Sequence, residues 1–333
     1  MAGVRAAARG PALAGLPAVL SGMRPELERL ESRLRDARGV EQQALRQLLD
    51  WVFASGGKRI RPALVFASAR LGRADEEAVA NLAAGLETLH AATLVHDDLV
   101  DSSLTRRGMP TVNTRWSAGA TVLAGDWLFA RAARFVAETE HVAVIKIFAR
   151  TLGTLTDGEL RQLFGRSGAP TLEQYEYRIY AKTASLFEAA AESAGHLMAM
   201  PPSQIEALAR FGRELGVAFQ LADDLLDFTG DPDLLGKPVG SDLRSGQVTL
   251  PALLHLRAHP EAAAWLRGDD EPGAAAVTRL IDAVRADSEA LAAARAAALQ
   301  RRERALDALR ELPASPARDE LARIADYVVA RDA

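Results

Sequence analysis

The stretch His96-Asp97-Asp98-Leu99-Val100-Asp101 closes a long apolar segment, and Asp223-Asp224-Leu225-Leu226-Asp227 closes a second one later in the chain. Each stretch places three carboxylates at positions i, i+1 and i+4. Aspartates are normally avoided in apolar core helices, and side chains four residues apart on a helix have Cβ atoms roughly 5–6 Å apart. Because such like charges repel one another, each cluster predicts a cation bound near it.

The ion expected at these clusters is Mg²⁺. Carboxylate oxygens suit hard divalent ions, and Mg²⁺ is usually held by one or two carboxylates together with water and substrate phosphates. One triplet alone would also fit a helix cap or a structural ion-pair cluster, but two triplets flanked by basic loops favour metal binding. The predicted metal ligands are Asp97, Asp98, Asp101, Asp223, Asp224 and Asp227.

Apolar residues recur at helical spacing through nearly the whole chain, with little alternation of the kind that strands show. The segments expected to be helical are Leu13–Ala37, Val40–Phe53, Pro62–Leu71, Glu76–Asp101, Ala118–Glu138, Val142–Phe164, Leu172–Met200, Gln204–Phe228, Leu250–Ala258, Gly273–Glu311 with a break, and Pro316–Ala330. Several are apolar on more than one face, as core helices of a large bundle are. No linker of disordered composition divides the chain, so we expect one all-α domain over residues 1–333.

Composition excludes several classes of function. The chain has 333 residues, 49% of them hydrophobic, with a formal net charge of −4, which gives no support to a nucleic-acid or anionic-membrane partner. No cysteine is present, so disulfides, zinc–thiolate sites and thiol nucleophiles are excluded, in keeping with a reducing cytoplasm. No apolar run approaches the about 20 residues that span a bilayer. Residues 1–10 form either a flexible extension or a targeting segment.

Lysine is rare in this chain, because arginine supplies nearly all of the positive charge. Of 40 basic residues only four are lysines, namely Lys58, Lys146, Lys182 and Lys237. An ammonium is a compact, strongly hydrated point charge, whereas a guanidinium is a planar fork. A retained lysine therefore suggests a site that requires the ammonium, unless it has survived by chance.

Basic and polar residues accompany both acidic clusters. Thr105-Arg106-Arg107-Gly108 follows the first, and Gly236-Lys237-Pro238 follows the second. Glycines and a lysine in a loop offer approachable backbone N–H groups and a point charge to phosphate oxygens. Further candidates for phosphate or substrate contacts are Gly57, Lys58 and Arg61 in a turn that opens a helix, His90 on the stripe of Asp97, Lys182 and Thr183 in an apolar helix, and Gln220 beside Asp223.

Together these features predict ionisation of an apolar diphosphate. Metal ions and basic side chains would stabilise charge that develops on the leaving group. A deep central cavity in the bundle would hold the apolar chain and exclude water from a carbocation. No serine, cysteine or glutamate nucleophile is required.

From about Trp51 to Pro251 the chain resembles the trans-isoprenyl diphosphate synthases, the polyprenyl synthetase family. The motifs that carry the resemblance are Gly56-Gly57-Lys58-Arg59-Ile60-Arg61-Pro62, the first aspartate cluster with Arg106-Arg107-Gly108, Lys182-Thr183, and Phe219-Gln220-Leu221-Ala222 with the second cluster. The resemblance implies an isoprenoid-synthase fold and a homodimer. It also implies head-to-tail condensation of isopentenyl diphosphate with an allylic diphosphate.

Residue roles follow from the same resemblance. It implies two Mg²⁺ at Asp97 and Asp101 and a third chiefly at Asp223. It assigns the allylic substrate to Arg106, Lys182, Thr183, Gln220 and Lys237, and isopentenyl diphosphate to Lys58, Arg61, His90 and Arg107, beside Gly57. The expected catalytic residues are Asp97, Asp101, Arg106, Lys182, Asp223 and Lys237.

Product length is implied by the residues before the first cluster. In the family, large aromatics at the positions of Ala92 and Thr93 stop elongation early, and Leu89 lies one turn further down. Small residues here predict a deep cavity. The overall sequence, including Val112-Asn113 and Gly125-Asp126, resembles long-chain polyprenyl synthases that make quinone side chains, with geranylgeranyl or farnesylgeranyl diphosphate as the medium-chain alternative. One departure concerns Gln247, where the family often has lysine, and it puts diphosphate affinity in doubt.

Two other functions remain open from the sequence. A terpene cyclase ionises the same substrates but has no second diphosphate to bind, so Lys58, Arg61 and His90 argue against it. A regulatory subunit of a heteromeric synthase generally loses parts of the aspartate motifs, and this chain keeps both.

Overall fold

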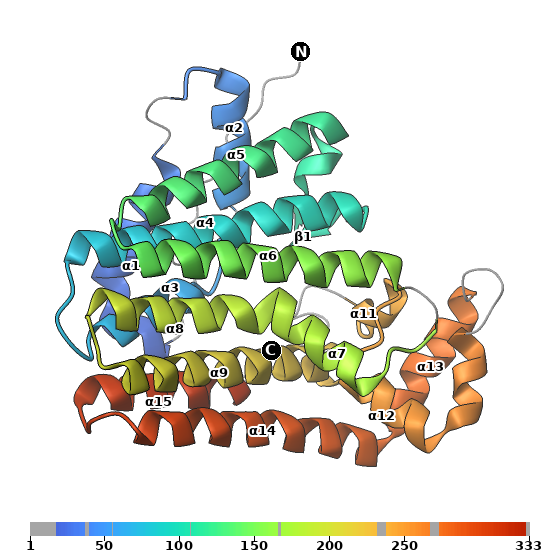
Figure 1. The fold of residues 1–333 in the computed structure, drawn as a ribbon. Coiled ribbons are helices and arrows are strands. Elements are labelled where there is room, and N and C mark those ends of the chain that lie inside the picture. The colour runs from blue at the N-terminus through green and yellow to red at the C-terminus, as the bar shows by residue number, and fades with distance from the viewer. Residues whose placement is uncertain are drawn as a thin grey trace. The chain divides into compact units, whose positions relative to one another are not determined.

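The computed structural model describes residues 18–36, 40–54, 56–106, 108–165, 168–231, 238–266 and 273–330. Helices account for most of them, and the only strands in these ranges are β1 (Thr105–Arg106) and β2 (Met109–Pro110). The two strands form a short antiparallel hairpin just after the first aspartate cluster (Figure 1). The all-α fold expected from the sequence is confirmed.

The chain forms two compact units. Unit 1 contains the described residues of Met1–Phe148 and Ser193–Met200, and unit 2 contains those of Ala149–Glu192 and Pro201–Ala333. The expectation of a single domain stays a prediction.

Unit 1 is organised around α4, which packs chiefly against α5 and α3. Leu82, Leu86 and Leu89 of α4 are fully buried. Gly85 lets α5 approach, since a Cβ there would lie 2.7 Å from a methyl carbon of Val136. The elements of this unit are η1 (Ala18–Met23), α1 (Arg24–Arg35), α2 (Gln43–Ala54), α3 (Ile60–Ala69), α4 (Glu76–Val100), β1, β2, η2 (Val112–Thr114), α5 (Ala118–Ala137), the start of α6 (Val142–Phe164) and the end of α8 (Ser185–Leu197).

Unit 2 is built on α9, which packs chiefly against α14. Tyr175, Phe228 and Leu280 are among the buried side chains of its core. Its elements are the rest of α6 from Ala149, α7 (Leu172–Ile179), η3 (Tyr180–Ala184), α8 up to Glu192, α9 (Pro202–Thr229), α11 (Ser241–Arg244), α12 (Leu250–Ala258), η4 (Pro260–Leu266), α13 (Ala274–Ala286), α14 (Ser288–Arg310) and α15 (Pro316–Val329).

Three expected helices differ in detail from the observed ones. The helix expected over Leu172–Met200 contains a π-helical turn, η3, and the one expected over Gly273–Glu311 breaks where the Asp287 carboxylate accepts a hydrogen bond from the Ala290 N–H and so caps α14. The first expected helix begins as the 3₁₀ segment η1, and its residues 13–17 lie outside the described part.

One described helix, α4, is long and apolar enough to cross a membrane by length and composition alone. The expectation that no apolar run approaches this length was therefore too strict. However, 67% of its most apolar window is buried inside the protein. Burial of this extent is what a core helix shows.

Candidate active site

The first acidic cluster lies at the C-terminal end of α4, with Asp101 as the C-cap residue. Asp98 is buried, and Arg106 of β1 donates from Nε to both of its oxygens at 2.9 and 3.0 Å. Burial raises the pKa of Asp98, while the hydrogen bond from Arg106 and its charge act to lower it. Asp97 is partly exposed and Asp101 is exposed. The cluster thus divides into a buried carboxylate that anchors the hairpin and two that face outward.

Because both clusters lie at or near the C-terminal end of a helix, the helix dipole disfavours their negative charge. The C-terminal end of a helix carries partial negative charge, so acidic groups there destabilise it by typically 0.3–1 kcal/mol each. Neither α4 nor α9 has a basic residue in its last turn, and in the first cluster Arg106 of β1 compensates only the buried Asp98 directly. The helix end and the neighbouring carboxylates would both favour a bound cation.

A small cavity of about 60 Å³ in unit 1 connects residues from separate motifs. Gly56, His90 and Arg106, which come from the glycine turn, from α4 and from β1, all line it together with the buried Asp98. The structure thus brings the candidates His90, Asp98 and Arg106 together within unit 1, beside Gly56 of the glycine turn. Among the other candidates near the turn, Gly57 and Arg61 are partly buried and Lys58 is exposed.

Arg59 holds this turn from inside. Its backbone has a left-handed φ of 48° and forms the N-cap of α3. Its guanidinium donates from Nε to Glu31 and from Nη1 to Glu87, both at 2.5 Å, and all three side chains are buried. Burial acts to lower the pKa of Arg59, but the two carboxylates outweigh it and the pKa is raised. These ion pairs hold in place the turn that carries Lys58 and Arg61. The motif alone does not reveal this role of Arg59.

His96, directly before the first aspartate, is held against α5. Its Nε2 lies 3.0 Å from the backbone oxygen of Val122, and its ring makes an edge contact with Phe129 at a centroid distance of 5.4 Å. A Cβ on Gly125 would lie 2.1 Å from His96 Nε2. Gly125 is therefore required for the ring to sit where it does.

The second acidic cluster, near the end of α9, divides in the same way as the first. Asp224 is buried and accepts hydrogen bonds from Tyr175 Oη at 2.6 Å and from Gln220 Nε2 at 2.7 Å. Burial is the main cause that raises its pKa to about 7. Asp227 is fully buried and accepts from the Asp242 N–H at 3.1 Å. Only Asp223 of the three is partly exposed.

Lys182 and Thr183 lie in the π-helical turn η3. Wide turns of this kind occur frequently at functional sites. Thr183 Oγ1 donates to Gln220 Oε1 at 2.6 Å, and Gln220 in turn donates to Asp224. Lys182 Nζ pairs with Glu159 Oε1 at 2.8 Å. The turn is therefore linked by hydrogen bonds to the aspartate-bearing part of α9, within unit 2.

Two glycines let α9 approach this turn at backbone distance. A Cβ on Gly216 would lie 2.5 Å from the Cα of Ala184, and one on Gly212 would lie 2.4 Å from the backbone oxygen of Phe187. Real Cβ atoms do not occur this close to another backbone. The spacing of α9 from η3 and α8 therefore depends on the absence of side chains at both positions.

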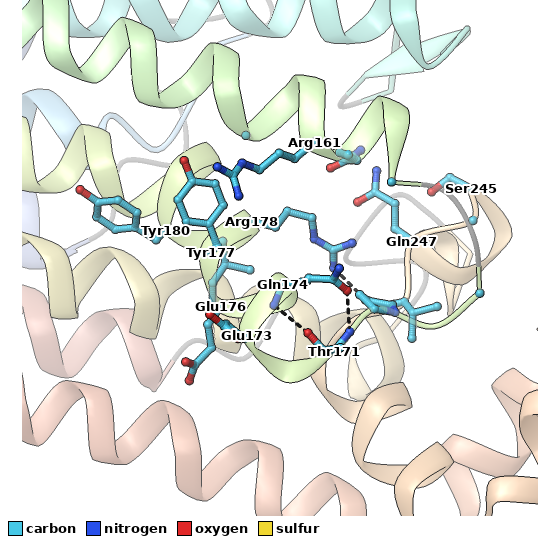
Figure 2. Close-up of a pocket in the computed structure, with 18 of the residues that line it drawn as sticks. Arg161, Thr171, Glu173, Gln174, Glu176, Tyr177, Arg178, Tyr180, Ser245 and Gln247 are labelled. Carbon is cyan, nitrogen blue, oxygen red and sulfur yellow. Dashed lines mark hydrogen bonds between the residues drawn. The ribbon is translucent and has the colours of Figure 1, made fainter.

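A large cavity of about 1550 Å³ in unit 2 has a different lining (Figure 2). None of the predicted metal or substrate residues is among the described residues that line it. Its Arg178 donates to the Val248 backbone oxygen at 2.7 Å, and its Arg161 pairs with Asp157 at 2.7 Å. Gln247 also lines it. A lysine in place of Gln247 would have added its charge at this cavity.

The remaining candidates are placed as follows. Leu89 and Ala92 are fully buried in α4, and Thr93 is partly buried with its hydroxyl donating to the His90 backbone oxygen at 2.8 Å. Arg107 and Lys237 lie outside the described residues.

Comparisons with known proteins agree on one kind of relative. Residues 42–283 match the family model described as polyprenyl synthetase. The chain is 38% identical to an octaprenyl diphosphate synthase of Escherichia coli, over 87% of this chain and 91% of that one. It is 37% identical to a nonaprenyl diphosphate synthase of Mycobacterium tuberculosis, over 94% and 93%. A crystal structure of a polyprenyl synthase from Caulobacter crescentus CB15, complexed with calcium and isoprenyl diphosphate, superposes with a TM-score of 0.87 at 36% identity, covering 95% and 97%.

Proposed function

The chain belongs to the polyprenyl synthetase family, and from this membership we propose that it condenses isopentenyl diphosphate with an allylic diphosphate, head to tail and with Mg²⁺, to give a long all-trans product. It is an enzyme of the trans-polyprenyl diphosphate synthase type. The relatives named above make octaprenyl and nonaprenyl diphosphates by name, which supports the long-chain proposal over the medium-chain alternative.

The observation that carries the metal proposal is the division within each aspartate cluster. Asp97, Asp101 and Asp223 are at least partly exposed at helix ends that lack basic residues, whereas their neighbours Asp98, Asp224 and Asp227 are buried. Outward carboxylate oxygens are the donors that Mg²⁺ prefers. We propose two ions at Asp97 and Asp101 and a third at Asp223. Asp98, Asp224 and Asp227 would each support the exposed carboxylates of their own cluster instead of supplying ligand oxygens.

The substrate proposal uses the basic residues around these carboxylates. Lys58, Arg61 and His90, with Gly57 and Arg107, would bind isopentenyl diphosphate. The allylic diphosphate would contact Arg106, Lys182, Thr183, Gln220 and Lys237. Both sets offer the charge-assisted hydrogen bonds that phosphate oxygens accept.

Bond breaking would begin at the allylic carbon. Mg²⁺, when bound, supplies Lewis-acid stabilisation of the charge on the leaving diphosphate. Lys182 and Arg106 would add positive charge to the stabilisation of the leaving group, so that the carbon–oxygen bond breaks and its electron pair leaves with the diphosphate. The isopentenyl double bond then attacks the allylic cation and forms the new carbon–carbon bond. Loss of one proton, for which the departed diphosphate is the proposed acceptor, restores a double bond.

We also propose that the protein is a homodimer, on the basis of the family resemblance. A cytoplasmic location is proposed as well, in keeping with the lack of cysteine in the sequence.

The test of this function uses the purified chain alone. With Mg²⁺, labelled isopentenyl diphosphate and farnesyl diphosphate, we expect elongated diphosphates whose length is read by chromatography after dephosphorylation. A hydrocarbon or terpene alcohol without elongation would indicate a terpene cyclase and overturn the proposal. Activity that appears only on addition of a second protein would indicate a subunit of a heteromeric enzyme.

Product length provides a separate prediction. Replacing Ala92 by phenylalanine places an aromatic ring where the side chain is now fully buried, and we expect the main product to shorten by several isoprene units. Because added bulk in a packed core also costs typically 1–3 kcal/mol, the melting temperature is measured in parallel. Ala92→Ser is the matched control and should keep the wild-type length. An unchanged product distribution in a folded Ala92→Phe enzyme would contradict the pocket assignment.

A further inference from the structure

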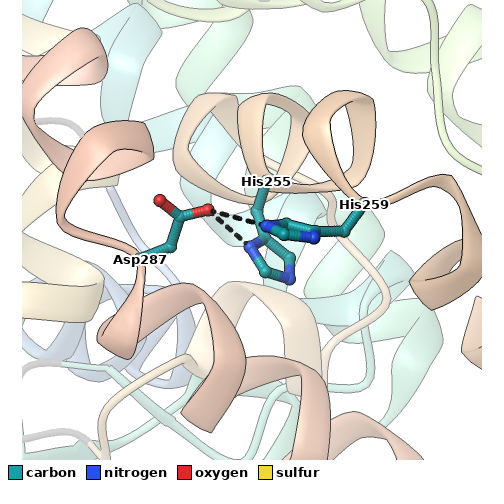
Figure 3. A group of neighbouring side chains, drawn as sticks. All are labelled: His255, His259 and Asp287. Atoms are coloured by element: carbon teal, nitrogen blue, oxygen red, sulfur yellow. Dashed lines mark hydrogen bonds and ion pairs between the residues drawn. The ribbon is translucent and has the colours of Figure 1, made fainter.

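Two histidines and an aspartate converge in unit 2, and none of them is among the residues assigned above (Figure 3). His255 is buried on α12, and His259 follows one turn later as the C-cap residue of that helix. Asp287 is the N-cap of α14. Histidines four residues apart lie on one face of a helix, a spacing that recurs in zinc-binding helices.

The aspartate offers one oxygen to both rings. Asp287 Oδ1 accepts from the Ala290 N–H at 2.9 Å, so it is occupied as a helix cap. Oδ2 lies 2.7 Å from His255 Nδ1 and 3.8 Å from His259 Nε2, and Figure 3 shows both rings beside it. The pKa of Asp287 is lowered, first by the Ala290 N–H and then by the hydrogen bond from His255, which keeps it a carboxylate.

The other nitrogen of His259 also faces an acid. Its Nδ1 lies 3.5 Å from Glu261 Oε1. If His259 Nε2 binds an ion, Glu261 is placed to hold the proton on Nδ1, as a carboxylate commonly does behind a metal-bound histidine. The negatively charged Asp287 Oδ2, 3.8 Å from Nε2, would also attract the cation.

The spacing suits a four-coordinate ion. One donor atom from each of His255, His259 and Asp287 lies within 4.8 Å of the others. Bonds of roughly 2.0–2.2 Å to nitrogen and oxygen in a tetrahedral zinc site place neighbouring donors roughly 3.3–3.6 Å apart. His255 Nδ1 lies 2.7 Å and His259 Nε2 3.8 Å from Oδ2, so small side-chain rotations would bring both into range. Binding through His255 Nδ1 would release its proton to solvent, as metal binding to histidine does.

We propose that His255, His259 and Asp287 bind one transition-metal ion of the Zn²⁺ class, leaving at least one position for water. Imidazole nitrogen suits zinc, cobalt, nickel and copper, whereas Mg²⁺ prefers oxygen ligands alone. This site therefore selects different ions from the aspartate clusters. The ion joins the end of α12 to the start of α14 and acts as a structural clamp.

The experiment measures metal binding and needs no prenyl-transfer activity. The full chain is stripped with a chelator and titrated with Zn²⁺ in millimolar Mg²⁺, which occupies the oxygen-only sites. We expect one equivalent to bind, with a rise of several degrees in melting temperature. Co²⁺ in place of Zn²⁺ is expected to give the visible absorption of a nitrogen-ligated, four-coordinate ion.

Two variants test the assignment with little risk to folding. His259→Gln changes a half-exposed side chain, and Asp287→Asn keeps a residue that caps helices equally well while removing Oδ2. Each should weaken Zn²⁺ binding at least about tenfold and abolish the Co²⁺ spectrum, because each removes a direct ligand. His196→Gln, a histidine outside the cluster, is the matched control and should bind as the wild type does.

Three outcomes would overturn the proposal. They are the absence of Zn²⁺ binding in excess Mg²⁺, binding that both variants retain, and a Co²⁺ spectrum typical of oxygen ligands only. In the last two cases the ion would be bound elsewhere in the chain.

Discussion

Replacing Asp101 by asparagine is expected to lower kcat/KM for isopentenyl transfer by about 10²–10³-fold, the size typical when one electrostatic group that acts on developing charge is removed. The side chain is exposed at the end of α4, so the change removes a charge without disturbing the core. We therefore expect the melting temperature to stay within about 1 °C of the wild type, as for exposed substitutions in general. Steady-state kinetics at several Mg²⁺ concentrations would also show a higher Mg²⁺ requirement.

The matched control for this prediction is Asp50→Asn, which removes an exposed carboxylate of unit 1 from α2. Its activity should stay near the wild-type value. Asp98→Asn gives a useful contrast, because it breaks the ion pair with Arg106 in a buried setting and should lower stability as well as activity. Wild-type activity and Mg²⁺ requirement in Asp101→Asn would show that this carboxylate holds no ion.

The second large effect is expected at Arg59. Replacing it by methionine leaves Glu31 and Glu87 buried without their shared cation. Removing one partner of a buried ion pair typically destabilises by about 3–5 kcal/mol, which corresponds to a loss of about 10 °C in melting temperature. In the enzyme that remains folded, we expect KM for isopentenyl diphosphate to rise more than KM for the allylic substrate. The reason is that the turn carrying Lys58 and Arg61 loses the ion pairs that hold it in place.

A compensated variant separates charge from packing. Arg59→Met combined with Glu31→Met and Glu87→Leu removes all three charges, and apolar replacement of a whole buried triad is often neutral or stabilising. Most of the lost stability should return. Arg29→Met on α1, at an exposed position, controls for the loss of an arginine in general. Equal melting temperatures for Arg59→Met and Arg29→Met would contradict the assigned role of the triad.

Helical periodicity predicted the fold well, because apolar spacing reports directly which segments bury a face. The cluster positions were also visible, since their acids interrupt otherwise apolar helices. What spacing cannot reveal is which member of a cluster turns inward. That depends on partners distant in sequence, such as Arg106 for Asp98 and Tyr175 for Asp224.

Other features lack a local signal altogether. The π-helical turn at Tyr180–Ala184 has the composition of an ordinary helix. The carboxylates that meet Arg59 come from α1 and α4, each 28 residues away in sequence. His255 and His259 were not predicted as a site, and the third member of their cluster, Asp287, joins them only through the fold.

The two glycines of α9 have a mechanical consequence. Gly212 and Gly216 bring the backbone of α9 against the backbone of η3 and α8, so no flexible side chain lies between them there. The separation of Lys182 and Asp223 is therefore set by backbone packing. Adjustment to ligands of different size must come from the adjoining loops, and a larger side chain at Gly216 would change this separation.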